Sequence, residues 1–228
     1  MASTASASLP AEPAAPTPRR RGAFIVLEGL DRSGKSTQVE KLVATLQDRG
    51  IDAVTARFPG KMIDSYLSQK SDLDDRAIHL LFSANRWERA TQILEDLNRG
   101  RTVVCDRYAF SGIAFSVIKG LSWSWCRAPD IGLPAPDLVL FLRVSSAVAE
   151  QRGGFGQERY EKREVQQKVA GAFKRLGETM PEGEWIEVDA DQAMEDVHRE
   201  IVSRVDTVLD SNKLDAPVQR LWEDEEGL

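Results

Sequence analysis

One short segment constrains this chain more than any other, the loop Gly29-Leu-Asp-Arg-Ser-Gly-Lys-Ser36. It matches the pattern G-x-x-x-x-G-K-[ST], follows an apolar run that ends at Leu27, and precedes a helical pattern that begins at Thr37. A strand, a glycine loop and a helix in this order are the context that a phosphate-binding loop requires. The alternative, a glycine turn that only joins a strand to a helix, gives no reason for the Lys-Ser pair in register. The loop therefore predicts a nucleotide-binding α/β chain.

Each part of this loop has an expected task. Glycines leave the backbone free to wrap around a polyphosphate, and the amide groups at the helix N-terminus supply partial positive charge. Lys35 adds a full positive charge, and the hydroxyl of Ser36 is a ligand for Mg²⁺. The loop residues that we expect to bind ATP are Gly29, Ser33, Gly34, Lys35, Ser36 and Thr37.

Short apolar runs alternate with longer helical patterns along the rest of the chain. Continuous apolar character indicates strands that are covered by helices on both faces. The expected strands are Ala23–Leu27, Ala53–Ala56, Thr102–Cys105, Leu138–Leu142 and Trp185–Val188. The expected helices are Thr37–Arg49, Lys61–Gln69, Leu73–Asn98, Phe110–Ile118, Ser145–Arg152, Glu161–Leu176 and Ala193–Leu209. This alternation predicts a doubly wound α/β fold with a five-stranded parallel sheet and helices on both faces.

The two ends of the chain depart from that pattern. Residues 1–22 are rich in Ala, Ser, Thr and Pro and contain no bulky residue after Leu9, so we expect a disordered leader. Its arginines are typical of a mitochondrial transit peptide, but its four prolines oppose an amphipathic helix. We expect one folded domain over residues 23–211 and an acidic tail over residues 212–228.

Composition argues against several classes of function. The net charge of -6 opposes a general affinity for nucleic acid, and no apolar run approaches the roughly 18 residues of a membrane helix. Cys105 and Cys126 form no metal-binding spacing, and so few cysteines suit a reducing compartment. We expect a cytoplasmic protein, with the nucleus as a second location and mitochondrial targeting less favoured.

A GTPase has to be considered, because Asn212-Lys-Leu-Asp215 matches the guanine-reading pattern N-K-x-D. This motif follows a long helical pattern instead of a buried strand. The chain's D-x-x-G, Asp31 to Gly34, lies inside the phosphate loop itself. A short motif outside its structural setting is usually chance, so the sequence does not favour a GTPase.

Four further segments decide the type of P-loop protein. They are Leu80–Glu88 (LLFSANRWE), Asp106–Gly112 (DRYAFSG), Pro129–Asp137 (PDIGLPAPD) and Arg152–Glu161 (RGGFGQERYE). In these motifs the chain resembles thymidylate kinases, from about Ala23 to Leu209, and the last segment is similar to the family's lid. The resemblance implies an ATP-dependent kinase that phosphorylates dTMP to dTDP in dTTP biosynthesis, with Mg²⁺ and as a homodimer. ATP and dTMP are then the expected partners, without nucleic acid or membrane.

The resemblance also assigns the catalytic residues. Arg32 stands inside the phosphate loop, where eukaryotic members carry a catalytic arginine that stabilises charge on the transferring phosphoryl group. Asp106 ends an expected strand at the carboxyl edge of the sheet, where ligands bind, and there a carboxylate holds Mg²⁺ through water. The catalytic set that we expect is Arg32, Lys35, Asp106 and Arg107, with Ser36 and Asp106 at the metal.

The expected acceptor site combines charged and aromatic side chains. Arg86 and Arg107 can form the guanidinium fork that suits a phosphate dianion, although each can instead make a local ion pair with an aspartate. The resemblance assigns Asp31 to the deoxyribose 3′-hydroxyl and uses aromatic rings, otherwise read as core, to wall in the pyrimidine. The expected dTMP-binding residues are Asp31, Phe58, Phe82, Arg86, Arg107, Gly112, Phe115 and Tyr160.

Two segments resemble those that contact the adenine nucleotide. In the glycine-rich lid, Gly153, Gly154 and Gly156 permit movement, and closure of such a lid excludes water and limits ATP hydrolysis. A plain surface loop is the alternative. The residues that we expect beside ATP here are Arg152, Phe155, Asp189, Ala190 and Asp191.

One segment departs from the family pattern. Thymidylate kinases read Phe-Pro, an acidic residue, Arg and Ser or Thr after the second strand, whereas this chain reads Phe58-Pro59-Gly60-Lys61. The arginine that is missing is one that the family uses to hold the dTMP phosphate, and a lysine lacks the bidentate fork. The departure leaves a second hypothesis open, a nucleotide-binding homologue whose catalysis is impaired.

Overall fold

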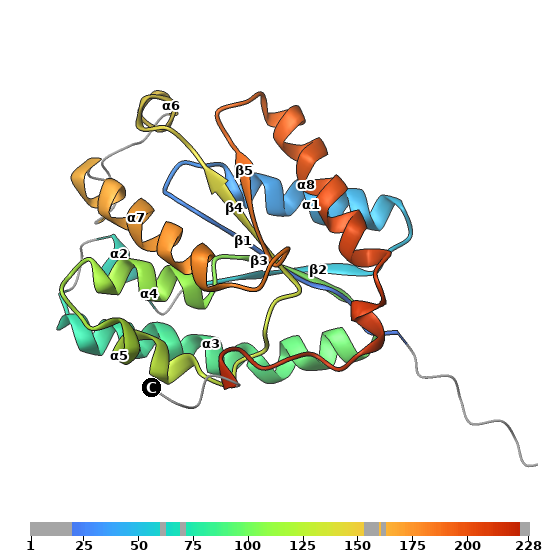
Figure 1. Cartoon of the computed structure of the whole chain (residues 1–228), viewed down its shortest axis with the longest axis horizontal. Coiled ribbons are helices and arrows are strands. Elements are labelled where there is room, and N and C mark those ends of the chain that lie inside the picture. The colour runs from blue at the N-terminus through green and yellow to red at the C-terminus, as the bar shows by residue number, and fades with distance from the viewer. Residues whose placement is uncertain (1–19, 60–62, 69–71, 153–159, 161–162, 224–228) are drawn as a thin grey trace, which may run out of the picture.

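The structure, a computed structural model, describes residues 20–59, 63–68, 72–152, 160 and 163–223. Its centre is a parallel sheet of five strands in the order β2-β3-β1-β4-β5 (Figure 1). The strands are β1 (Phe24–Gly29), β2 (Ala53–Arg57), β3 (Thr102–Asp106), β4 (Leu138–Arg143) and β5 (Trp185–Asp189). All five expected strands are confirmed, and each is observed to extend one or two residues further toward its carboxyl end.

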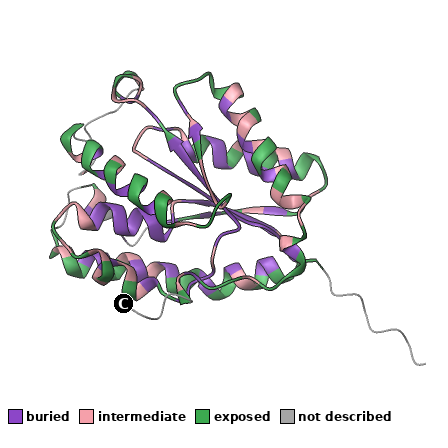
Figure 2. Ribbon diagram, in the orientation of Figure 1, coloured by how far each residue is buried: buried purple, intermediate pink, exposed green. Residues whose placement is uncertain are grey.

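Helices cover both faces of this sheet (Figures 1 and 2). One face packs against α1 (Lys35–Asp48) and α8 (Met194–Leu209) around a core that includes Ile25, Leu42 and Ile201. The other face packs against α3 (Asp75–Asn98), α4 (Ala109–Val117) and α7 (Arg163–Thr179) around Phe24 and Phe173. Burial on both faces explains why all six residues of β1 are buried. The predicted doubly wound fold is confirmed.

The smaller helices differ most from the expectations. Helix α2 spans only Asp64–Leu67, and the outer residues of the helix expected over 61–69 lie outside the described residues. Helix α6 spans Ser146–Gln151. The sequence patterns missed α5 (Trp123–Arg127) and the 3-10 turn η2 (Ala128–Asp130), since elements of five and three residues show no helical period. The guanidinium of Arg175 lies 4.3 Å from the ring centre of Trp123.

Both ends of the folded domain reach further than expected. Arg21 was assigned to the leader, but it is buried and pairs with Asp137 at 2.7 Å. The expected tail begins with the 3-10 turn η3 (Asn212–Asp215), and its Leu214 and Leu221 are buried. Apolar side chains spaced through a charged segment therefore still anchor it. Within the described part of the chain, no helix is long and apolar enough to span a membrane.

The N-K-x-D motif has a structural task in this fold. Leu214 fills the core between sheet and helix, and Lys213 donates hydrogen bonds to the carbonyl of Asp137 and the carboxylate of Glu184. These contacts account for the motif without a guanine base, in agreement with the expectation that it is not a GTPase signature.

Candidate active site

The phosphate loop joins β1 to α1, and its glycines are required by the backbone. Gly29 has a φ of 149°, and a Cβ atom at this position would lie 2.6 Å from the carbonyl oxygen of Leu142. Gly34 has a φ of 92° and caps α1 without a side-chain hydrogen bond. The first amide groups of α1, which have no partner inside the helix, thus remain available to an anion.

Lys35 is a buried cation of the loop whose pKa is shifted. Its side chain is buried, and its Nζ donates to the Leu30 carbonyl at 2.6 Å and to Ser33 Oγ at 3.2 Å. Burial, reinforced by the charge of Arg107, lowers the pKa of Lys35 to about 7, although nearby carboxylates oppose this shift. An arriving polyphosphate would return the pKa of Lys35 upward, because an anion favours the charged form.

Two oxygen ligands of the expected metal meet at the end of the loop. Ser36 Oγ donates to Asp106 Oδ2 at 2.5 Å, and the Nε of Arg57 lies 3.8 Å from the same carboxylate. Hydroxyl and carboxylate oxygens are the donors that Mg²⁺ prefers, usually together with water and substrate phosphate. The residues present therefore fit Mg²⁺. Thr37, the next residue of α1, is exposed.

Arg107 connects the phosphate loop to the residues expected to bind dTMP, which we call the acceptor side. It donates to the Gly29 carbonyl at 3.0 Å, forms a short ion pair with Asp31, and lies over the ring of Phe115 at 5.5 Å. Gln166 holds the other side of Asp31, donating to its Oδ2 at 2.8 Å and accepting from its amide at 3.0 Å. The structure thus brings the expected residues Asp31, Arg107 and Phe115 together.

Glu28 binds the backbone that follows Arg107. The sequence patterns did not single out this residue. It is fully buried at the end of β1 and accepts hydrogen bonds from the amides of Tyr108 and Ser111 and from Ser111 Oγ at 2.5 Å. Burial raises the pKa of Glu28, although Arg107 and the Ser111 hydrogen bond counteract it. Glu28 thereby fixes the turn in which Arg107 adopts a φ of 65°. A carboxylate inside an apolar strand was the available signal.

Arg86 lies in a different environment from the expected phosphate fork. Its guanidinium is buried and forms two hydrogen bonds with the buried carboxylate of Asp130, at 3.1 and 2.6 Å. A Cβ atom on Gly112 would lie 2.9 Å from this guanidinium, so Gly112 permits its close approach. This is the local ion pair that we named as the alternative for Arg86, and its place among the dTMP-binding residues stays a prediction.

The expected aromatic residues pack in separate groups. Phe58 is buried and packs on Tyr108 at 5.8 Å between ring centres, while Phe82 packs with Tyr66 near α2. Phe115 and Tyr160 face each other with ring centres 4.9 Å apart. The guanidinium of Arg107 lies over the ring of Phe115, so these last two rings are close to Arg107.

The expected adenine-side residues lie at the other end of the loop. Arg152 donates to the Arg32 carbonyl at 2.9 Å and to the Ala190 carbonyl at 2.6 Å, so it ties the phosphate loop to the turn after β5. Asp191 accepts from the Ser145 amide at the start of α6, and Asp189 pairs with Arg143. The remaining lid residues that we singled out, Gly153, Gly154, Phe155 and Gly156, lie outside the described residues, as do Gly60 and Lys61.

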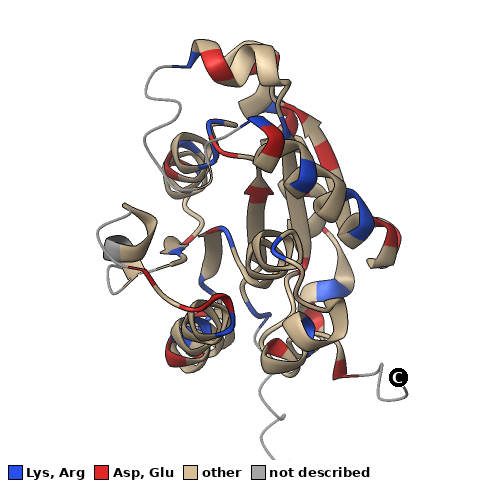
Figure 3. Ribbon diagram, turned by 90° about the vertical axis from the view of Figure 1, so that its left-hand side faces the viewer, with Lys and Arg blue, Asp and Glu red and all other residues tan. Residues whose placement is uncertain are grey.

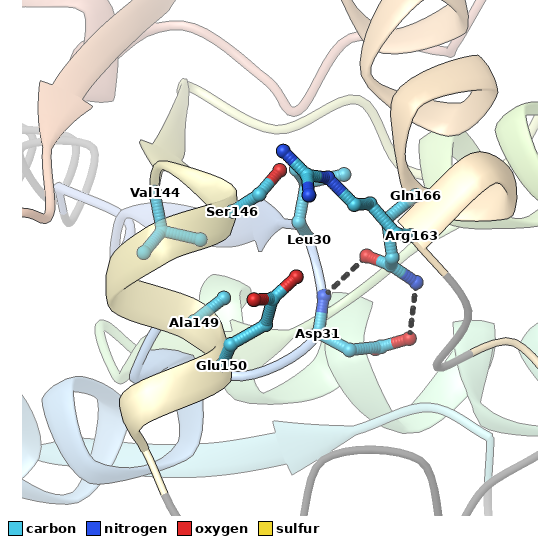
Figure 4. A pocket seen from close by; sticks show the side chains of 8 residues that line it. All are labelled: Leu30, Asp31, Val144, Ser146, Ala149, Glu150, Arg163 and Gln166. Carbon is cyan, nitrogen blue, oxygen red and sulfur yellow. Dashed lines mark hydrogen bonds between the residues drawn. The ribbon is translucent and has the colours of Figure 1, made fainter.

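A small pocket opens beside the phosphate loop, between α6 and α7 (Figure 4). Asp31 and Gln166 form one wall through their paired hydrogen bonds, and Ser146 and Glu150 form the opposite wall. Figure 3 views the molecule from the left-hand side of Figure 1 and shows basic and acidic residues on the helices as well as on the loops. The fold and the loop together define a P-loop nucleotide-binding protein.

Comparisons with known proteins identify the type of P-loop protein. The family profile described as Thymidylate kinase matches residues 27–201. A thymidylate kinase of Schizosaccharomyces pombe is 52% identical over 86% of this chain and 98% of its own length, and one of Homo sapiens is 48% identical over 89% and 98%. The structure of the thymidylate kinase from Candida albicans superposes with a TM-score of 0.75 at 34% identity, covering 88% of this chain and 98% of that one.

This chain belongs to the thymidylate kinase family, as its motifs led us to expect. It is therefore an enzyme, a nucleoside monophosphate kinase. The match covers nearly the whole length of these relatives.

Proposed function

We propose that this protein transfers the γ-phosphoryl group of ATP to dTMP and forms dTDP, a step of dTTP biosynthesis. The observation that carries the proposal is the position of Arg107, which binds the phosphate loop through Gly29 and the acceptor side through Asp31 and Phe115. One guanidinium thus lies between the two places where phosphates are expected. The family membership supports ATP and dTMP as the two substrates.

On the donor side, the loop amides and Lys35 bind the β- and γ-phosphates of ATP, and Arg32 stabilises the charge that develops on the transferring group. Arg152, held by the carbonyls of Arg32 and Ala190, borders the nucleotide. Ser36, and Asp106 through water, would hold Mg²⁺, which would supply positive charge to neutralise the phosphates.

On the acceptor side, Asp31 binds the sugar hydroxyl and Arg107 the phosphate of dTMP. The rings of Phe115 and Tyr160 form the wall against which the pyrimidine lies. Acceptor phosphate and phosphate loop then lie on opposite sides of Arg107, which places the two reactants for in-line transfer. We also propose that the enzyme is a homodimer.

One steady-state experiment tests this proposal. The purified protein receives ATP with Mg²⁺ and, separately, dTMP, dUMP, dCMP or thymidine, and release of ADP is followed. We expect dTMP to stimulate ADP release most strongly above the rate without an acceptor.

Two outcomes would contradict the proposal in different ways. If ATP binds but dTMP releases no more ADP than the control without acceptor, the impaired homologue that the short Pro59–Gly60 connection suggested would replace the active kinase. If thymidine is preferred over dTMP, the enzyme is not a monophosphate kinase.

A further inference from the structure

A partly buried lysine outside the expected site lies between two tyrosines, Tyr66 and Tyr160. Lys119 lies two residues beyond α4, and its side chain is 16% exposed. Its Nζ donates to Tyr66 Oη at 3.0 Å and pairs with Asp75 at 2.9 Å. The same Nζ lies 5.4 Å from the ring centre of Tyr66 and 5.2 Å from that of Tyr160. One ammonium group therefore joins α2, α3, the end of α4 and the segment before α7.

The two tyrosines also contact each other. Tyr66 Oη and Tyr160 Oη are 3.2 Å apart, and Tyr66 itself is buried against Ile63 and Ile78. The backbone carbonyl of Tyr160 accepts a hydrogen bond from Gln166 at 2.9 Å. Tyr160 is thus held at its phenol end by the Tyr66–Lys119 pair and at its backbone by the residue that also holds Asp31.

The held ring is part of a row that ends at the reacting groups. Lys119 lies over Tyr160, Tyr160 packs on Phe115, and Phe115 lies under Arg107. A cation at each end of two aromatic rings is favourable, because the ring faces carry negative charge. A change in the angle of the Tyr160 ring would therefore change the packing of Phe115 and, through it, the position of Arg107.

The protonation states of Lys119 and Tyr160 favour the contacts between them. Burial opposes the charge of Lys119, but its hydrogen bonds with Asp75 and the two tyrosines raise its pKa above the usual lysine value. Burial likewise raises the pKa of Tyr160, so its phenol stays neutral. A charged donor and a neutral phenol form a stronger hydrogen-bonded pair than two neutral groups.

We propose that Lys119 and Tyr66 are positioning residues for the acceptor, which hold the Tyr160 ring against Phe115 as the wall of the dTMP site and so set the affinity for dTMP. This inference rests on the proposed function, because it concerns the acceptor of the same reaction. Neither residue touches the reacting phosphates in this account. Their removal should therefore change the use of dTMP and leave the binding of ATP as it is.

The test compares Lys119→Met with Lys119→Arg, Tyr66→Phe and the control Lys41→Met. Lys41 also forms a helix-joining ion pair, with Glu195 at 2.8 Å, but between α1 and α8 on the other face of the sheet. We expect Lys119→Met to raise the KM for dTMP about tenfold, the effect of losing one hydrogen bond to a charged group. The KM for ATP should stay within about twofold and kcat should change less than the dTMP KM.

The milder variants make the result independent of folding. Tyr66→Phe removes a single oxygen atom and should raise the dTMP KM about threefold, while Lys119→Arg keeps the charge and should recover part of the loss. Lys41→Met should behave as the wild type. Equal changes in the KM of ATP and dTMP, or an unchanged dTMP KM in both Lys119→Met and Tyr66→Phe, would overturn the inference.

Binding measurements separate this inference from the proposed function. If the wild type releases no ADP with dTMP, the proposed activity fails, and calorimetric titration with dTMP alone then decides the inference. Weaker dTMP binding by Lys119→Met than by the wild type would support it. Equal binding by the two proteins, or no dTMP binding by the wild type, would contradict it.

Discussion

The phosphate loop and the acceptor side use charge in different ways. In the loop, Lys35 comes from the same eight-residue motif as the backbone that it contacts, and its hydrogen bonds go to Leu30 and Ser33 of that motif. On the acceptor side, Arg86 and Arg107 come from α3 and the end of β3, and each meets a carboxylate from another segment. A cation whose hydrogen bonds go to neutral groups can exchange them for phosphate oxygens. An arginine that already pairs with a carboxylate is held in place by that pair and can offer phosphate only its remaining N–H groups.

The largest expected effect separates structural from functional arginines on the acceptor side. Asp130→Ala leaves the buried guanidinium of Arg86 without its partner, which should lower the free energy of unfolding by about 3–5 kcal/mol. Urea unfolding measures this loss. Asp206→Ala, which breaks the exposed pair with Arg49, is the matched control and should cost less than about 1 kcal/mol. A similar loss in both variants would show that Arg86 does not depend on Asp130.

The next effect concerns the loop. Lys35→Ala removes the cation that meets the transferring phosphate, and we expect kcat to fall by about 10²–10³-fold, comparable to the loss of one transition-state donor. Steady-state kinetics with saturating dTMP measure it, with Lys41→Ala as the control. An increase in the KM for ATP with kcat unchanged would mean that Lys35 binds substrate and transition state equally.

An insertion after Pro59 tests whether the acceptor side lacks a phosphate-binding arginine. An acidic residue, Arg and Thr inserted after Pro59 restore the family's missing phosphate contact, and kcat/KM for dTMP should rise about ten- to a hundredfold. The same insertion with Gln in place of Arg is the control for loop length. If both insertions have the same effect, the length of the connection matters and the arginine does not.

The smallest effect is a pH dependence of the loop. Because burial lowers the pKa of Lys35 to about 7, the free protein carries this charge at pH 6 and has mostly lost it at pH 8. ATP favours the charged form, so affinity for the magnesium complex of ATP should fall about tenfold over this range, with proton uptake on binding. Lys35→Arg stays charged and corrects for titration of the nucleotide. An equal slope in both proteins would contradict the shift.

The sequence predicted the parts of this molecule that are determined by residues close together in the chain. The phosphate loop and the five strands follow from local patterns, and the strands were located to within one or two residues. Short elements such as α5 were missed, because five residues show no period. The buried pair of Arg21 and Asp137 was missed because its members are far apart in the chain.

The acceptor side was less predictable for the same physical reason. Arg86 was expected beside a phosphate, and only the folded chain reveals that Asp130 reaches it. Gln166 and Lys119 carry no motif, and their importance comes from the segments that they join. A lone carboxylate in a buried strand, as at Glu28, is the one signal of this kind that a sequence pattern offers.

Transfer of label from γ-labelled ATP to dTMP tests the central claim most directly. The purified wild-type protein is incubated with Mg²⁺, labelled ATP and dTMP, and the products are separated by chromatography. We predict labelled dTDP in an amount equal to the ADP formed. The Lys35→Ala variant should form labelled dTDP only at its low residual rate. Labelled inorganic phosphate without labelled dTDP would contradict the claim that this chain is an active dTMP kinase.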